Sequence, residues 1–118
     1  MTDKEKVERV LASVMDQIPE VEGLIAADFD GNVIIGQTLT SMDHSMIIKN
    51  IIKVIDASKE LSTSIEKGSL NELRITSDEG FTLVIIGISL IFVAITGTDA
   101  ASSLGLIVRN LSVALKQF

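Results

Sequence analysis

The chain has 118 residues, a formal net charge of −6, no cysteine and one histidine. That length corresponds to one ordinary domain. Without cysteine the chain forms no disulfide framework, thiolate metal site or thiol nucleophile. Its negative net charge argues against binding to a nucleic-acid backbone. Apolar residues make up 47%, so we expect a partner, a second copy or a membrane to cover part of the surface.

The N-terminal segment predicts a helix over about residues 3–17. Apolar residues from Val7 to Ile18 recur at the three- and four-residue spacing of one helical stripe. Pro19 ends the helix, because the residue before a proline is pushed out of the helical region. The charged start MTDKEKVERV has no apolar core and does not look like a signal peptide. We therefore expect a cytoplasmic protein.

Two apolar runs around Asp30-Gly31 predict a β-hairpin, with strands over 23–29 and 32–37. Asp-Gly is typical of a type I′ turn, which needs a positive φ at both central residues. Asp28 and Asp30 could instead form an acid/base or metal pair. We favour the structural interpretation, in which Asp30 makes the turn and Asp28 ends a strand, because of the turn chemistry. Calcium would also need more oxygen ligands than this loop offers.

A second helix is expected over about residues 42–65. Thr40 fits the N-cap of a capping box with Asp43 as its third helical residue, and Gly68 closes the helix. His44 falls in the first turn. We expect a solvated surface histidine there and not a general base, because no nucleophile is placed near it.

The apolar face of this helix is broader than one sheet requires. It fills an arc of about 180°, whereas packing on a sheet takes a stripe a little over about 100° wide. The residues of the arc are Ile47, Ile48, Ile51, Ile52, Val54, Ile55, Leu61 and Ile65, with Ser58 and Ser62 among them. The surplus indicates a second packing surface. The opposite side carries Lys49, Lys53, Asp56, Glu60 and Lys67, and is either a solvated face or a recognition surface.

Three strands are expected between the second helix and the last one. Leu73 and Ile75 alternate with Glu72 and Arg74, which predicts an edge strand with one wet face. Residues 81–97 carry no charge and predict two central strands with a turn near 87–90. A membrane-spanning helix is disfavoured there, because β-branched residues dominate the run and its flanks are acidic.

The C-terminal segment predicts a third helix, capped by Thr98 or Asp99, with an apolar stripe from Leu104 to Phe118. Gly105 weakens a helix by about 1 kcal/mol relative to alanine, so we expect a packing reason for it. The predicted order is α-β-β-α-β-β-β-α. Phosphate-binding glycine motifs are absent from the sequence, and we expect no cofactor, no metal site and no enzymatic activity.

Three stretches of the sequence resemble the Roadblock family of dynein light chains and GTPase regulators, in the longin/profilin-like group. They are VEGLIAADFDGNVI, LRITSDEGFTLVIIGISLIFVAITG and TDAASSLGLIVRNL, in which Leu104-Gly105-Leu106 is the most recognisable piece. The resemblance implies one α+β domain over residues 1–118. Its single five-stranded antiparallel sheet would have the order 2-1-5-4-3, with the first and last helices on one face and the middle helix on the other.

The resemblance also implies a homodimer in which the two middle helices and the two third strands pair, giving a platform for a small Ras-like GTPase. Glu72 and Arg74 would pair across the dimer or face water, and we favour the dimer because an edge strand needs a partner. The expected interface residues are Ile47, Ile51, Val54, Ile55, Ser58, Leu70, Glu72 and Arg74. The expected GTPase contacts are Lys49, Lys53, Asp56 and Glu60. A structural scaffold or light-chain subunit of a larger complex remains an alternative, as does a small-molecule sensor domain. We expect no nucleic-acid partner and no direct membrane insertion.

Overall fold

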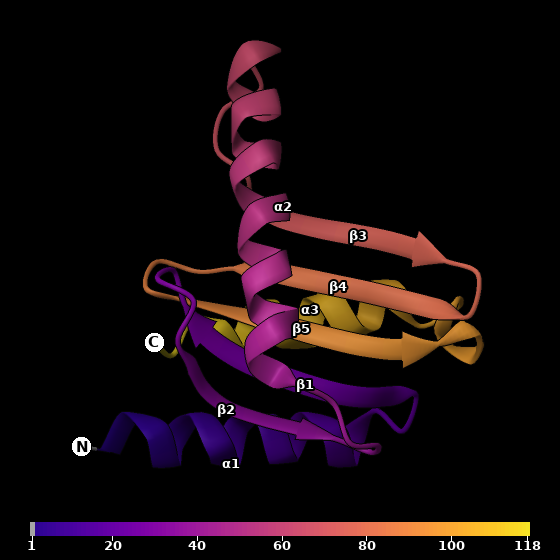
Figure 1. The fold of residues 1–118 in the computed structure, drawn as a ribbon. Helices are drawn as coiled ribbons and strands as arrows, with labels where there is room; N and C mark the ends of the chain where they lie inside the picture. Colours follow the sequence, from indigo (N-terminus) through magenta and orange to yellow (C-terminus); the bar gives the residue numbers. More distant parts are fainter. Residues whose placement is uncertain (1) are drawn as a thin grey trace.

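One antiparallel sheet of five strands separates two layers of helices (Figure 1). This computed structural model describes residues 2–118. The elements are, in chain order, α1 (Thr2–Gln17), β1 (Val21–Asp28), β2 (Val33–Thr38), α2 (His44–Ser64), β3 (Glu72–Ser77), β4 (Gly80–Ile86), β5 (Leu90–Gly97), the 3-10 turn η1 (Thr98–Ala100) and α3 (Leu104–Leu115). The strand order is β2-β1-β5-β4-β3. The predicted element order and sheet topology are thus confirmed.

The central strands are buried on both faces, as their apolar runs predict. On one face, Leu24, Ala26, Phe92 and Ala94 pack with residues of α1 and α3 in one apolar cluster. On the other face, Ile25, Ala27, Ile91 and Val93 pack with residues of α2 in a second cluster. Residues 81–97 therefore form β4 and β5, and no helix within residues 2–118 is long and apolar enough to cross a membrane.

The hairpin forms where predicted, but its turn is different. Gly31 has a φ of 91°, whereas Asp30 has no positive φ, so the predicted type I′ turn is wrong. Asp28 makes the turn instead: one of its carboxylate oxygens accepts from the backbone N–H groups of Asp30 and Asn32, both at 2.9 Å. Hairpin loops longer than two residues are commonly built around a type I turn, which a glycine in the left-handed region can follow.

Both ends of α2 differ from the prediction. The N-cap is Asp43 and not Thr40, because the Asp43 carboxylate accepts from the backbone N–H of Met46 at 3.0 Å. At the other end the chain turns before Gly68. Glu66 has a φ of 59°, and the N–H of Lys67 donates to the Ser62 carbonyl at 2.9 Å, which closes the helix.

The third helix begins later than predicted. Thr98 and Asp99 lie in η1, and α3 starts after Ser103, whose side chain makes no capping hydrogen bond. A Cβ on Gly105 would meet no atom of the described chain within 4 Å. The packing reason expected for Gly105 is therefore not found within residues 2–118.

Candidate functional site

Helix α2 crosses the sheet and covers only part of its face (Figure 1). Ile48, Ile51 and Ile55 are buried against the strands. The C-terminal half of the helix extends past β3 (Figure 1), and there Leu61 is 60% exposed and Ile65 54% exposed. The broad apolar arc predicted for this helix therefore divides into a buried stripe and an uncovered one.

A groove of about 340 Å³ lies beside α2, on the uncovered part of the same sheet face. The helix contributes one wall and β3, β4 and β5 contribute the floor. The lining residues are Ile47, Asn50, Ile51 and Val54 from α2, and Ile75, Thr82 and Ile95 from the strands. All but two of them are apolar, so water in this groove contacts a surface with the composition of a core.

The groove reaches the edge of the sheet, because its lining residue Ile75 lies on β3, which is the last strand in the order and pairs with β4 in the described chain. The Nε of Arg74 donates to the Glu72 carboxylate at 2.7 Å along this exposed edge. Leu70, just before β3, is half-buried against the α2 cluster. The structure thus brings the edge strand and the open side of α2 together.

The residues predicted for a dimer interface fall into two groups. Ile51 and Ile55 are already buried within the chain, at 6% and 1% exposure. Val54 is 37% exposed, and Ile47 and Ser58 are half-buried. The two interior isoleucines therefore have little surface left to offer a partner, whereas the other three retain some.

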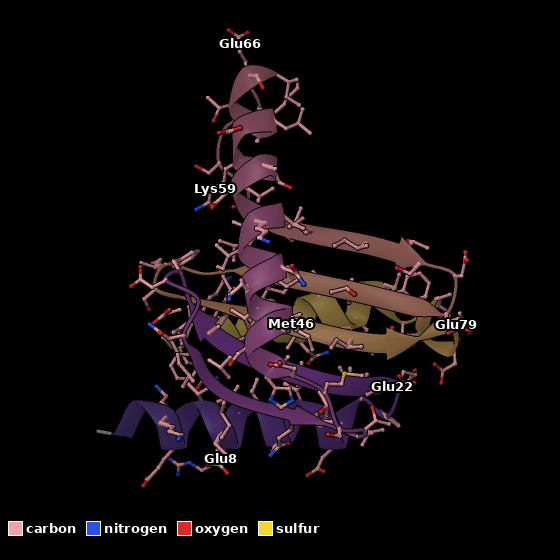
Figure 2. The ribbon with its side chains drawn as sticks, viewed as in Figure 1. Glu8, Glu22, Met46, Lys59, Glu66 and Glu79 are labelled. Atoms are coloured by element: carbon pink, nitrogen blue, oxygen red, sulfur yellow. The ribbon has the colours of Figure 1, made fainter. Side chains whose placement is uncertain are left out.

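The four charged residues predicted for partner binding are exposed on α2, and they are Lys49, Lys53, Asp56 and Glu60. Two of them, Lys49 and Lys53, line a hollow with Asp30 and Gly31 of the β1–β2 turn. Figure 2 shows Lys59 on the side of α2 away from β3, where its ammonium lies 5.1 Å from the centre of the Phe29 ring. This charged surface and the hairpin turn are therefore neighbours.

His44 is an anchor for α2 and not the solvated histidine that we predicted. It is half-buried, and its Nε2 lies 3.1 Å from the Thr38 hydroxyl oxygen. Because that hydroxyl donates to the Thr40 carbonyl at 2.7 Å, it accepts from Nε2–H of His44. The ring also packs on Gly36, where an added Cβ would lie 2.5 Å from Nδ1. The N-terminus of α2 is thereby fixed to β2.

The aspartate pair of the hairpin has a structural explanation. Hydrogen bonds from the Asn32 side chain and from backbone N–H groups hold the pKa of Asp28 below its usual value. A carboxylate held ionised in this way is a poor general base. Among the residues that the structure describes, no three potential metal-ligating side chains come together.

One polar contact was missed by sequence reasoning. The Ser103 hydroxyl donates to the Glu20 carboxylate at 2.7 Å, and this hydrogen bond lowers the pKa of Glu20. It joins the α1–β1 turn to the start of α3. The partners are 83 residues apart, so no local pattern could reveal them.

No protein-family model and no curated protein matches the chain. Solved structures do. MglB of Myxococcus xanthus superposes with a TM-score of 0.86 and 15% identity, over 99% of this chain and 87% of that one. The Roadblock/LC7 domain from Streptomyces avermitilis gives 0.81 and 11%, over 92% and 91%. MglB of Thermus thermophilus gives 0.79 and 11%, over 97% and 91%. The fold of this chain is therefore the one that MglB and Roadblock/LC7 domain structures share.

Proposed function

We propose that this chain is a non-catalytic cytoplasmic subunit that forms a homodimer through α2 and β3 and regulates a small Ras-like GTPase. The observation that carries the dimer is the half-covered sheet face, with its apolar groove beside an unpaired edge strand. The GTPase partner rests on the resemblance to Roadblock domains and on the shared fold.

A second copy of the chain would suit the groove, because its α2 presents exposed apolar side chains that could cover the apolar lining. The exposed apolar residues of this region lie about evenly on either side of Val54, and they are Met42, Met46, Leu61 and Ile65. An antiparallel copy centred near Val54 sets Leu61 of one helix beside Met46 of the other. It also sets Ile65, at the C-terminal end of one helix, beside Met42, which precedes the other. The overhanging half of each α2 then covers the neighbouring subunit's open sheet face.

The β3 edges add a second reason for a twofold arrangement. An unpaired edge strand is a template for further pairing, and two antiparallel copies of β3 satisfy each other. The result is one continuous sheet with both α2 helices on the same face. Stable homodimers of this kind bury more than about 2,000 Å², largely apolar like a core.

The outward side of the paired helices is the proposed GTPase surface, with Lys49, Lys53, Asp56 and Glu60 as its contacts. No arginine lies on α2, because Arg9 is on α1, Arg74 is on β3 and Arg109 is on α3. Arg74 also donates to Glu72. We therefore propose that the chain regulates the GTPase by binding one of its nucleotide states more tightly than the other, without an inserted arginine finger.

Two adjacent substitutions on α2 separate dimer formation from GTPase binding. Lys53→Glu reverses a charge on the exposed side, and Val54→Asp places a charge in the proposed interface. Immobilised wild type is incubated with the source proteome containing either GDP or a non-hydrolysable GTP analogue, and bound GTPases are identified. We expect one nucleotide state to be retained preferentially, with retention lost in Lys53→Glu while the dimer persists.

Two outcomes contradict the regulatory proposal. Equal retention of both nucleotide states favours a passive scaffold, because a partner shifts a switch only by its differential affinity. Loss of stimulated GTP turnover in Arg9→Ala, Arg74→Ala or Arg109→Ala, with binding intact, overturns the non-catalytic mechanism.

A further inference from the structure

The outward side of α3 carries apolar side chains that the rest of the chain does not cover. The inward side packs on the sheet through Ile107, Leu111 and Leu115. On the opposite side, Leu106 is 57% exposed and Val113 58% exposed. Large apolar side chains exposed next to one another can mark a surface that a partner covers.

One of these side chains, Val113, lines a groove between α1 and α3. It has a volume of about 250 Å³ and an apolar floor made by Val10, Val14, Val113 and Ala114. Its rim is polar and rich in amides: Arg9, Ser13, Gln17, Asn110 and Gln117. A groove between two helices that has an apolar floor and a polar rim is the usual seat of a third, amphipathic helix.

The first turn of α3 leaves room for such a helix to approach. The space beside Gly105 is open within the described chain. Gly105 precedes Leu106, so a partner can come close to the backbone next to an exposed apolar side chain. Such an approach by a partner would explain the glycine at position 105, for which the described chain offers no packing reason.

The charges around the groove specify the partner's chemistry. Residues 104–118 contain Arg109 and Lys116 but no acidic side chain, and Arg9 borders the groove from α1. Among the side chains that the structure describes, the one ion pair joins Glu72 and Arg74, so neither Arg9 nor Arg109 is neutralised. The Arg9 guanidinium at the rim of the groove, together with Arg109 elsewhere on α3, complements carboxylates of a partner.

We propose that this α1–α3 surface, formed by Arg9, Val10, Leu106, Arg109 and Val113, binds an amphipathic helix of a partner protein that carries acidic residues beside its apolar stripe. The surface lies on the opposite side of the sheet from α2, so such a helix and a GTPase bind without competing. A flat membrane surface fits a groove between two helices less well than a helix does, and the vesicle assay below tests it.

A displayed library of amphipathic helices tests this proposal without a known partner. Every member has the same leucine stripe, and the flanking positions vary among glutamate, glutamine and lysine. Selection on the full chain is expected to enrich glutamate on the flanks. Synthetic peptides of the enriched sequences are then titrated by fluorescence anisotropy, and their contacts are mapped by NMR on the full chain.

Matched variants test whether the peptides bind at the α1–α3 surface. Leu106→Asp and Arg109→Glu should each weaken peptide binding by about tenfold or more, as for central interface residues. Both side chains are exposed, so both variants should fold. Ile88→Asp makes the same change at a side chain that is 95% exposed on the β4–β5 turn, and should leave binding unchanged.

Several results would overturn the proposal. They are enrichment of lysine or of no flank type, NMR shifts centred on α2, and equal affinity of wild type and Leu106→Asp. Binding of the full chain to phosphatidylserine-containing vesicles, lost in Leu106→Asp, would assign the surface to a membrane instead.

Discussion

Replacing Gly36 with alanine should weaken the attachment of α2 to β2. The new Cβ would lie 2.5 Å from Nδ1 and 2.9 Å from Cε1 of His44, whereas ordinary van der Waals contacts begin at 3.4 Å. The imidazole ring must therefore move by close to an ångström. That movement breaks the hydrogen bond from Nε2 to the Thr38 hydroxyl, which is 3.1 Å long.

The expected loss follows from two contributions. A broken hydrogen bond removes about 0.5–1.5 kcal/mol, and overpacking typically costs about 1–3 kcal/mol. We expect the free energy of unfolding to fall by about 2–3 kcal/mol in Gly36→Ala, measured by urea denaturation followed by circular dichroism. All variants are compared at one protein concentration, because self-association makes stability depend on concentration.

His44→Ala provides the control. The three atoms nearest the new Cβ all belong to His44, so removing the ring also removes the clash. Gly36→Ala should then cost little in the His44→Ala background, so the coupling energy in the double-mutant cycle should be about 2–3 kcal/mol, close to the full cost in wild type. An equal loss in both backgrounds would refute the proposed anchor.

Three further outcomes are expected. Gly80→Ala should destabilise the fold more than Gly36→Ala in the same denaturation assay, because its Cβ would overlap the backbone carbonyl of Thr96, which cannot rotate away. Gly105→Ala should raise the free energy of unfolding by about 0.5–1 kcal/mol, because a helical glycine is replaced where space is open. Stability should fall as the pH drops below the ordinary pKa values of Asp28 and Glu20, 3.8 and 4.5, because both pKa values are lowered in the fold and the stabilisation present above those values is lost on protonation. Thermal melts should show a shallower acid dependence in Asp28→Asn than in wild type.

The order of elements was predictable from the sequence because each element carries a strong local signal. The stripe of α1 is typical of a helix, and in the uncharged run that becomes β4 and β5 the β-branched residues and acidic flanks favour strands over a membrane-spanning helix. The strand order came from the resemblance to Roadblock domains and not from these patterns, because periodicity does not specify which strands are neighbours. The observed sheet confirms it.

The errors occurred where neighbouring residues compete for one role. Thr40 and Asp43 are both good N-caps, and the path of the chain after β2 decides in favour of Asp43. Thr98, Asp99 and Ser103 compete in the same way before α3. Which of them begins a helix depends on where the preceding strand ends and on the path of the chain after it.

The site was predictable in outline but not in detail. The broad arc of α2 indicated more apolar surface than one sheet covers, and the structure leaves Val54, Leu61 and Ile65 exposed there, whereas their packing against a partner stays a prediction. Periodicity gives the direction in which a side chain points, but not how far the sheet extends beneath it. For that reason Ile51 and Ile55 could not be recognised as interior residues before the sheet was placed.

Sedimentation equilibrium of wild type, Lys53→Asp and Val54→Asp at micromolar concentration tests the central claim, that a second copy covers the groove beside α2. Wild type and Lys53→Asp should sediment with twice the mass of the chain. A buried unpaired charge costs several kcal/mol, so Val54→Asp should associate at least about a hundredfold more weakly. Val54 is 37% exposed within one chain, so this variant should remain folded. A folded wild-type monomer, or a dimer that Val54→Asp leaves unchanged, would contradict the claim.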